Sequence, residues 1–223
     1  MGEFKFAISM SLDGFVAGPN QTVENPLGEG GEQLHEWAYG LEAFRRPHGM
    51  EGGEVDASSA VLEEAGDAGA AIMGRGMFGG GSGPWGADPW EGWWGDEPPF
   101  RYPVFVLTHH PRDPLVKGET TFTFVTDGIE SALARAREAA GARHVRLGGG
   151  ANVAQQYLAA GLLDEVLISV VPILLHGGTR LFEDLGGARV ALEQVETIPA
   201  PGVTHVRYRV RRGEDGDAGE RSD

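Results

Sequence analysis

The chain has 223 residues, 41% of them apolar, a formal net charge of −15 and no cysteine. This length and apolar content allow one substantial core, so we expect one domain, and the lack of cysteine excludes disulfides, thiolate nucleophiles and cysteine-ligated metals. The negative charge disfavours nucleic acid and membranes as partners, because both polyanions would be repelled over most of the surface. The N-terminal residues lack the basic start and apolar run of a signal peptide, which predicts a cytoplasmic location.

The first part of the chain is predicted to contain two strands and two helices. Residues 4–10 form a strand, and residues 15–18 form a second, short strand after a tight turn. Apolar side chains at spacings of three and four over residues 32–46 predict one amphipathic helix. Asp56 is the expected N-cap of a further helix, which stops at Gly66.

The second part alternates between strands and helices. Predicted strands cover residues 70–73, 104–107, 121–125, 143–147 and 166–171. Asp127 and Glu130 have the spacing of a capping box at the start of one helix, and residues 151–160 form another. Residues 189–198 and 203–211 are predicted to pair as an antiparallel hairpin.

This order of elements predicts a three-layer α/β fold around a mostly parallel sheet, closed by an antiparallel C-terminal hairpin. Residues 1–212 are expected to form this single domain. Residues 213–223 are charged and lack large apolar side chains, which predicts a disordered acidic tail. Residues 79–103 contain four tryptophans and five prolines without helical or strand periodicity, so this segment must pack on another part of the protein.

Gly148, Gly149 and Gly150 join a predicted strand directly to a predicted helix. Glycines let backbone N–H groups approach an anion closely, and a helix N-terminus adds unpaired donors and roughly +0.5 of a charge. This arrangement predicts a phosphate site for a nucleotide-type ligand. An ordinary tight turn explains the three glycines equally well when they are considered alone.

Several segments together resemble a known family. They are residues 9–18 (SMSLDGFVAG), 72–78 (IMGRGMF), 104–108 (VFVLT), 148–150 (GGG) and 162–166 (LLDEV). In this order they resemble the dihydrofolate reductase superfamily, and more closely its branch related to the C-terminal reductase domain of the bifunctional riboflavin-biosynthesis deaminase/reductase. The resemblance covers most of residues 5–185 and implies a dihydrofolate-reductase-like fold that binds NADPH.

In that family, Gly74 and Arg75 would meet the cofactor phosphates at a strand-to-helix junction, a task that suits the donor fork of a guanidinium. A surface salt bridge is the alternative for Arg75. Thr108, His109 and Arg112 follow a strand at the place where the family holds the adenosine 2′-phosphate, which favours NADPH over NADH. Adjacent histidines in a turn are otherwise typical of solvated surface.

The resemblance implies further cofactor contacts. They fall on Ser9, Val16, Ala17, Gly148, Gly149, Gly150, Ala151, Asn152 and Val153. The first three would flank the nicotinamide ring, although plain core packing explains Val16 and Ala17 as well. The glycines would lie under the nicotinamide and the pyrophosphate, often with a cis peptide between Gly148 and Gly149 in this family. The last three would begin the helix that closes on the phosphates.

The sequence defines the substrate-binding residues less sharply than the cofactor-binding residues. Hydride transfer is accompanied by proton transfer, and Asp13 and Glu36 are the acidic candidates for it. A turn-forming aspartate is the alternative for Asp13, and Glu36 lies beside the apolar stripe, which disfavours reduction of folate. Trp37, Trp85 and Trp93 are the predicted substrate contacts, because indoles stack on flat heterocycles. For the tryptophan-rich segment, a groove plug or a dimer contact is the alternative.

The predicted function is NADPH-dependent hydride transfer to a small heterocyclic or carbonyl substrate. One alternative is a riboflavin-pathway reductase acting on a 5-amino-6-ribosylamino pyrimidine, for which the sequence shows no obvious basic cluster. Another is a nucleotide-binding module without turnover. The histidines lack metal-ligand spacing, so no metal is predicted, and the family resemblance makes a homodimer the expected assembly.

Overall fold

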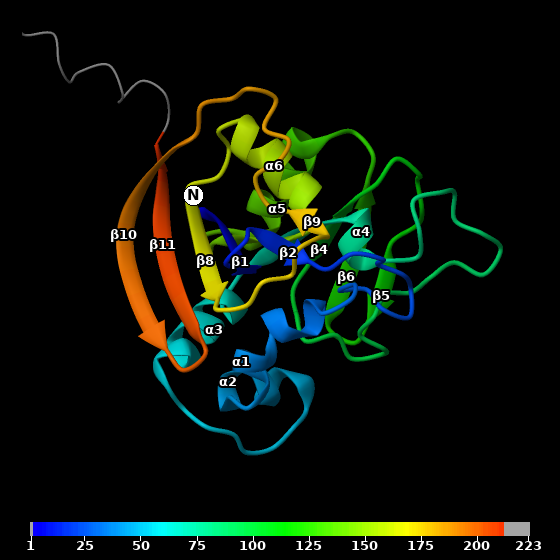
Figure 1. Ribbon diagram of the computed structural model, residues 1–223. Helices are drawn as coiled ribbons and strands as arrows, with labels where there is room; N and C mark the ends of the chain where they lie inside the picture. Colours follow the sequence, from blue (N-terminus) through cyan, green and yellow to red (C-terminus); the bar gives the residue numbers. More distant parts are fainter. Residues whose placement is uncertain (1, 212–223) are drawn as a thin grey trace, which may run out of the picture.

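The computed structural model describes residues 2–211, so the tail predicted at residues 213–223 lies outside the described part of the chain. A nine-stranded sheet runs through the molecule in the order β10-β11-β8-β1-β7-β3-β4-β6-β5 (Figure 1). Its strands are β1 (Phe4–Ser11), β3 (Ala70–Gly74), β4 (Val104–Leu107), β5 (Leu115–Lys117), β6 (Thr120–Val125), β7 (Val145–Gly149), β8 (Glu165–Val171), β10 (Ala191–Ala200) and β11 (Val203–Arg211). A separate two-stranded sheet pairs β2 (Phe15–Ala17) with β9 (Thr179–Arg180).

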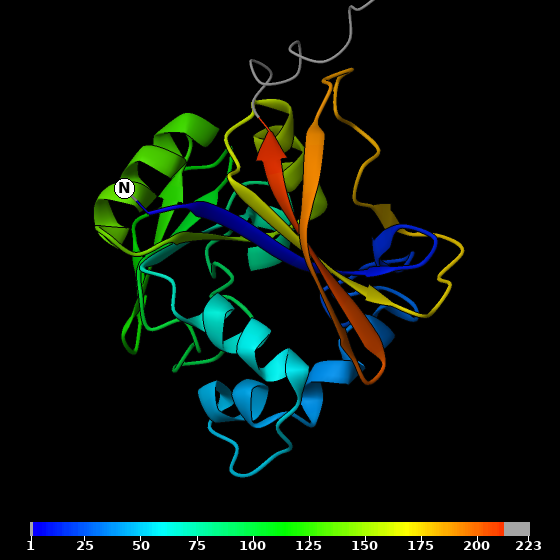
Figure 2. The same cartoon turned by 90° about the vertical axis from the view of Figure 1, so that its left-hand side faces the viewer.

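Helices cover both faces of the large sheet, so the fold has three layers with the sheet in the middle (Figure 2). They are α1 (Glu36–Tyr39), α2 (Glu42–Arg45), α3 (Ala57–Gly66), α4 (Arg75–Phe78), α5 (Ile129–Ala140) and α6 (Ala151–Ala159), with 3-10 turns η1 (Gly31–Leu34) and η2 (Arg46–His48). The helices α5 and α6 lie on one face, whereas α1, α2 and α3 lie on the other. No helix within the described residues is both long and apolar enough to cross a membrane.

The six central strands from β8 to β6 run parallel, and the antiparallel strands lie at the two edges. At one edge, β10 and β11 form the predicted hairpin, with β11 antiparallel to β8. At the other edge, β5 is an antiparallel strand that the sequence did not predict. The predicted α/β fold with a mostly parallel sheet and an antiparallel C-terminal hairpin is confirmed.

Each face of the sheet has its own apolar core. On the side of α5 and α6, Phe4 and Phe6 are buried, and the ring of Phe4 meets the edge of Tyr157 at 4.8 Å between centroids. On the opposite side, Met73 and Phe122 pack with aromatic residues of the tryptophan-rich segment. The predicted need of residues 79–103 for a packing partner is therefore met by the sheet itself.

The single helix predicted over residues 32–46 is wrong, because the structure breaks it into η1, α1 and α2. Leu41 is extended, with φ −83° and ψ 139°, and pairs with Glu54 in an isolated parallel bridge. Across this bridge the N–H of Glu42 donates to the Glu54 carbonyl, and the N–H of Glu54 donates to the Gly40 carbonyl, both at 2.9 Å. Backbone groups that a continuous helix would use internally are thus bonded to a distant segment.

Two helix starts show where capping rules succeed and fail. Asp56 caps α3 as predicted, and Ser59 completes the capping box, although α3 continues through Gly66 rather than stopping before it. The capping box predicted from Asp127 and Glu130 is wrong. Gly128 is the N-cap of α5, and the Asp127 carboxylate instead accepts hydrogen bonds from the side chains of Ser131 and Arg135.

Candidate functional site

The carboxyl ends of β1, β3, β4 and β7 open into a cleft of about 1290 Å³, the position at which open parallel sheets bind ligands. Thirteen of the residues predicted for the cofactor line it: Ser9, Val16, Ala17, Gly74, Arg75, Thr108, His109, Gly148, Gly149, Gly150, Ala151, Asn152 and Val153. Trp37 and Trp93, predicted for the substrate, also line it. Segments far apart in the sequence therefore meet around one space.

The triple glycine forms the turn between β7 and α6. Gly149 has φ 121°, a conformation that L side chains rarely adopt. A Cβ at Gly148 would lie 3.1 Å from Sδ of Met77, so this glycine keeps the neighbouring segment close. The cis peptide lies between Gly149 and Gly150, one bond later than the sequence predicted. Gly150 is also the N-cap of α6 and, being glycine, has no side chain to cap that helix end.

Arg75 begins α4 directly after Gly74, the last residue of β3. A Cβ at Gly74 would lie 2.6 Å from Cγ2 of Val153, so glycine permits the close contact between these two cleft segments. The Arg75 side chain donates from Nε to the Gly81 carbonyl at 2.7 Å and from Nη2 to the Gly80 carbonyl at 2.9 Å. Its remaining nitrogen, Nη1, is buried and has no hydrogen-bond partner in the described part of the chain.

Two arginine side chains lie close to the indole ring of Trp85. The guanidinium carbon of Arg75 lies 3.0 Å from the ring centroid, and that of Arg112 lies 4.8 Å from it. Burial, and secondly the charge of Arg112, lower the pKa of Arg75 to about 10. The arrangement concentrates positive charge behind the cleft wall, which favours an anion as ligand.

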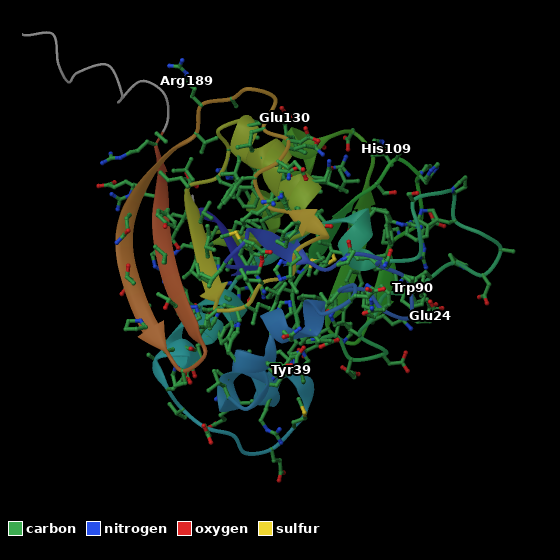
Figure 3. All side chains as sticks on the ribbon, in the orientation of Figure 1. Glu24, Tyr39, Trp90, His109, Glu130 and Arg189 are labelled. Atoms are coloured by element: carbon green, nitrogen blue, oxygen red, sulfur yellow. The ribbon has the colours of Figure 1, made fainter. Side chains whose placement is uncertain are left out.

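The segment after β4 is only partly placed as the sequence predicted. Thr108 is buried in the cleft wall, and its hydroxyl accepts a hydrogen bond from the N–H of His110. His109 is exposed at the rim, beyond the end of β4, on the same side of the molecule as Trp90 (Figure 3). Arg112 does not line the cleft, because its guanidinium turns toward Trp85 and donates to the Trp90 carbonyl.

A polar row crosses three neighbouring strands on the cleft side of the sheet. Ser9 of β1 is paired in register with Ser169 of β8, which is paired with His205 of β11. Nδ1 of His205 lies 2.8 Å from the Ser169 hydroxyl, and Nε2 lies 2.9 Å from the hydroxyl of Ser58 on α3. Trp37 covers the row: its Nε1 donates to Ser9 Oγ, and its ring stands edge-on to His205 at 4.9 Å.

Sequence reasoning missed Ser169, His205 and Ser58. One signal was present, since Ser169 is the single polar residue within the apolar run of residues 166–171. The pairing of this serine with a histidine on β11 depends on strand register, which the sequence does not specify.

The family model described as RibD C-terminal domain matches residues 5–204 of this chain. The chain belongs to the RibD C-terminal domain family. A search of curated proteins found no match to it.

Solved structures share the fold of this RibD C-terminal domain protein. A candidate riboflavin biosynthesis protein from Shewanella sp. PV-4 is 21% identical with a TM-score of 0.62, and the match covers 95% of this chain and 100% of that one. Dihydrofolate reductase from Enterococcus faecalis, solved with NADP(H), is 14% identical with a TM-score of 0.51 over 95% and 98% of the two chains. Both likenesses support the dihydrofolate-reductase-like fold expected from the sequence.

A third similar structure is the diaminohydroxyphosphoribosylaminopyrimidine deaminase/5-amino-6-(5-phosphoribosylamino)uracil reductase from Thermotoga maritima. It is 14% identical, with a TM-score of 0.56, over 94% of this chain but only 57% of the other. The RibD C-terminal domain protein thus spans little more than half of that bifunctional enzyme.

In this RibD C-terminal domain protein, neither acid predicted for proton transfer lines the cleft. The Asp13 carboxylate accepts hydrogen bonds from the Ser11 hydroxyl and from the N–H groups of Leu175 and His176. These bonds, with the Ser11 bond first, lower the pKa of Asp13 to about 2. The Asp13 carboxylate therefore ties the turn after β1 to residues 175–176. Glu36 is exposed at the start of α1.

The tryptophan-rich segment is fixed by indole hydrogen bonds to backbone carbonyls. Trp93 donates to the Met77 carbonyl, and Trp85 donates to the His110 carbonyl. Trp93 lines the cleft, as predicted for a substrate contact, whereas Trp85 lies outside it and meets the ring of Phe124 edge-on at 5.0 Å. Its indole lies against the guanidinium of Arg75.

Proposed function

We propose that this chain is an NADPH-dependent reductase that transfers a hydride to a small heterocyclic or carbonyl substrate. The observation that carries the proposal is the convergence of residues 74–75, 108–109 and 148–153 on one cleft at the strand ends. Membership of the RibD C-terminal domain family supports the same conclusion.

The residues of the cleft fit a dinucleotide with several phosphates. The uncapped start of α6 at Gly150 leaves backbone N–H groups for phosphate oxygens. A phosphate oxygen that accepts from Nη1 of Arg75 would relieve the cost of a buried donor without a partner. The hydroxyl of Thr108 and the rim position of His109 suit the additional 2′-phosphate of NADPH. When bound, NADPH supplies the hydride.

The substrate would lie against Trp37 and Trp93. Nε1 of Trp37 donates to the Leu34 carbonyl at 3.0 Å, and Nε1 of Trp93 donates to the Met77 carbonyl at 2.8 Å. Because both indoles are held in place, they provide a fixed aromatic surface that can stack on a flat ring and exclude water.

A riboflavin-pathway aminopyrimidine is a second candidate substrate, favoured by a basic end of the cleft. Arg101, Arg143 and Arg146 all line the cleft, near the starts of β4 and β7. Nε of Arg146 is buried without a hydrogen-bond partner among residues 2–211. Arginines at this end of the cleft could bind the phosphate of a ribosylated substrate, the feature that the sequence did not reveal.

Cofactor binding is the decisive test. At a concentration of 100 times Kd, a ligand that binds the folded state stabilises it by about 2.7 kcal/mol, so NADPH should raise Tm by roughly 5–10 °C. NADPH and NADP⁺ should bind more tightly than NADH, as measured by thermal shift and by nicotinamide fluorescence. No response to NADPH at millimolar concentration would remove the reductase proposal, and a preference for NADH would remove the 2′-phosphate assignment.

An assay of NADPH oxidation distinguishes a reductase from a nucleotide-binding module without turnover. We expect NADPH oxidation in the presence of the ribosylated aminopyrimidine or of a small carbonyl compound. Tight cofactor binding without oxidation by either class of compound would favour the module.

A further inference from the structure

Trp85 lies outside the cleft and contacts two of the segments proposed to bind phosphate. On one side, the guanidinium carbon of Arg75 lies 3.0 Å from the centroid of the indole ring. On the other side, Nε1 of the indole donates to the carbonyl of His110 at 3.0 Å. One side chain therefore joins the segment that follows β3 to the segment that follows β4.

The indole has a fixed place against the sheet. Its ring stands edge-on to Phe124 of β6 at 5.0 Å and to Phe78 of α4 at 6.0 Å. The neighbouring residues 81–84 and 86–88 are all exposed, whereas Trp85 is half-buried. Because edge-to-face contacts orient a ring as well as bury it, Trp85 anchors an otherwise exposed stretch of the tryptophan-rich segment.

The ring of Trp85 orients the guanidinium of Arg75. A guanidinium that stacks on an aromatic face keeps the N–H groups in its own plane available for hydrogen bonds. Two of its nitrogens donate to the carbonyls of Gly80 and Gly81, so the guanidinium cannot turn freely within the stack. Nη1 is the nitrogen left for a phosphate oxygen, and its direction is set by the ring and the two carbonyls together.

The N–H group of Trp85 holds the turn at residues 108–110. The His110 carbonyl accepts from the indole, and the His110 N–H donates to the Thr108 hydroxyl at 3.2 Å. A hydroxyl that accepts from a backbone N–H keeps its own proton available to donate. Thr108 lines the cleft, so in this turn its hydroxyl offers a donor to an anion there.

We propose that Trp85 is a positioning residue that sets Arg75 and the turn at residues 108–110 relative to each other, so that one ligand is bound by two of its phosphate groups. The proposal rests on the reductase function proposed above, in which Arg75 binds a phosphate and Thr108 suits the 2′-phosphate of NADPH. The ring of Trp85 then contributes to the affinity for any dinucleotide, whereas its N–H group contributes to the preference for a 2′-phosphate.

Two substitutions separate the ring from the N–H group. Trp85→Phe keeps an aromatic ring beside Arg75 and removes the donor to His110. The ratio of the Kd for NADH to the Kd for NADPH should therefore fall about 3- to 10-fold, while the Kd for NADH stays within about threefold of wild type. Trp85→Leu removes both groups, so its Kd for NADH should also rise, by about 3- to 30-fold. Fluorescence titration measures both constants.

Trp90→Phe is the matched control for the loss of the N–H group. Nε1 of Trp90 donates to the Phe78 carbonyl at 2.8 Å, so the substitution removes a hydrogen bond of the same kind from the same tryptophan-rich segment. Since this bond does not lead to the turn at residues 108–110, the ratio of the two Kd values should stay within about twofold of wild type. An equal fall of the ratio in Trp90→Phe and Trp85→Phe would mean general loosening of the segment and would overturn the proposal.

The indole N–H resonances provide a second test, which does not depend on NADPH. With inorganic pyrophosphate as probe, the Nε1–H resonance of Trp85 should shift in wild type but not in Arg75→Ala, because the phosphate acts on the ring through the guanidinium. The Nε1–H resonance of Trp90 should shift less. A role of Trp85 in packing alone would give no shift that depends on Arg75.

The outcomes separate this inference from the reductase proposal. If NADPH binds but both Trp85 variants keep the wild-type Kd values for NADPH and NADH, the role of Trp85 is refuted. If NADPH does not bind, the reductase proposal fails, and the pyrophosphate titration then decides this inference. A shift of the Trp85 resonance that is lost in Arg75→Ala supports the inference, and the absence of a shift in wild type overturns it.

Discussion

Replacement of Arg75 by alanine isolates the contribution of one guanidinium to cofactor binding. Two of its nitrogens are bonded to the carbonyls of Gly80 and Gly81, and only Nη1 has no partner among residues 2–211. The variant therefore removes one charge-assisted hydrogen bond to a phosphate, worth about 1.5–3 kcal/mol. At 1.36 kcal/mol per factor of ten, Kd for NADPH should rise roughly 10- to 150-fold.

The assay is a fluorescence titration with NADPH at constant ionic strength. Arg209→Ala is the matched control, because it removes the same charge from the exposed hairpin ion pair with Glu193. Its Kd should stay within about twofold of wild type, since a distant surface charge is largely screened. Arg75→Lys keeps the charge, but a lysine cannot both hold the two carbonyls and reach a phosphate. Its Kd for NADPH should therefore lie between those of Arg209→Ala and Arg75→Ala.

Loop anchoring is the competing explanation, and unfolding measurements address it. If Arg75 served only to hold the loop at Gly80 and Gly81, Arg75→Ala would lower the stability of the free protein and leave NADPH affinity within about twofold. That result, or an equal loss of affinity in Arg209→Ala, would refute the assignment of Arg75 to the phosphate site.

Two further predictions concern stability. Gly74→Ala should destabilise the protein by about 1–3 kcal/mol in denaturant unfolding, because the new Cβ meets the stiff side chain of Val153. Gly76→Ala is the control: its Cβ meets nothing within 4 Å, so the substitution should be neutral or stabilising. Equal effects of the two substitutions on stability would contradict the packing argument. Asp13→Asn should lower Tm at neutral pH, and the gap to wild type should narrow as pH falls. A carboxyl whose pKa is lowered to about 2 contributes stability that is fully present above its ordinary pKa of 3.8 and is lost as pH falls through about 2. A gap that does not change between about pH 6 and pH 3 would contradict this role.

The parallel strands could be predicted because their signal is local. The run at residues 166–171 is apolar except for Ser169, as expected for a strand buried on both faces, and β8 covers it with one added residue. The helix predicted at residues 32–46 failed for the opposite reason. Its apolar spacing is real, but the backbone at Leu41 is committed to a bridge with Glu54, and a pattern read along one segment cannot show a partner elsewhere.

Some residues of the candidate site could likewise be predicted from the sequence, and others could not. Gly74, Arg75 and the triple glycine lie in short motifs whose order along the chain resembles a family, so they could be assigned before their meeting in space was known. The direction of the Arg112 side chain could not be predicted, because it depends on where Trp85 and the Trp90 carbonyl are placed. Likewise, the contact between Ser169 and His205 exists only because β8 and β11 are paired in this register.

The Arg75 guanidinium is held by neutral carbonyls, and no carboxylate pairs with it within the described residues. Its positive charge is therefore kept in a protein whose net charge is −15. An anionic dinucleotide approaching from a distance meets repulsion from the whole molecule, and attraction acts only close to the cleft. Salt screens the long-range part more strongly than the short-range part, so moderate ionic strength should speed association instead of slowing it.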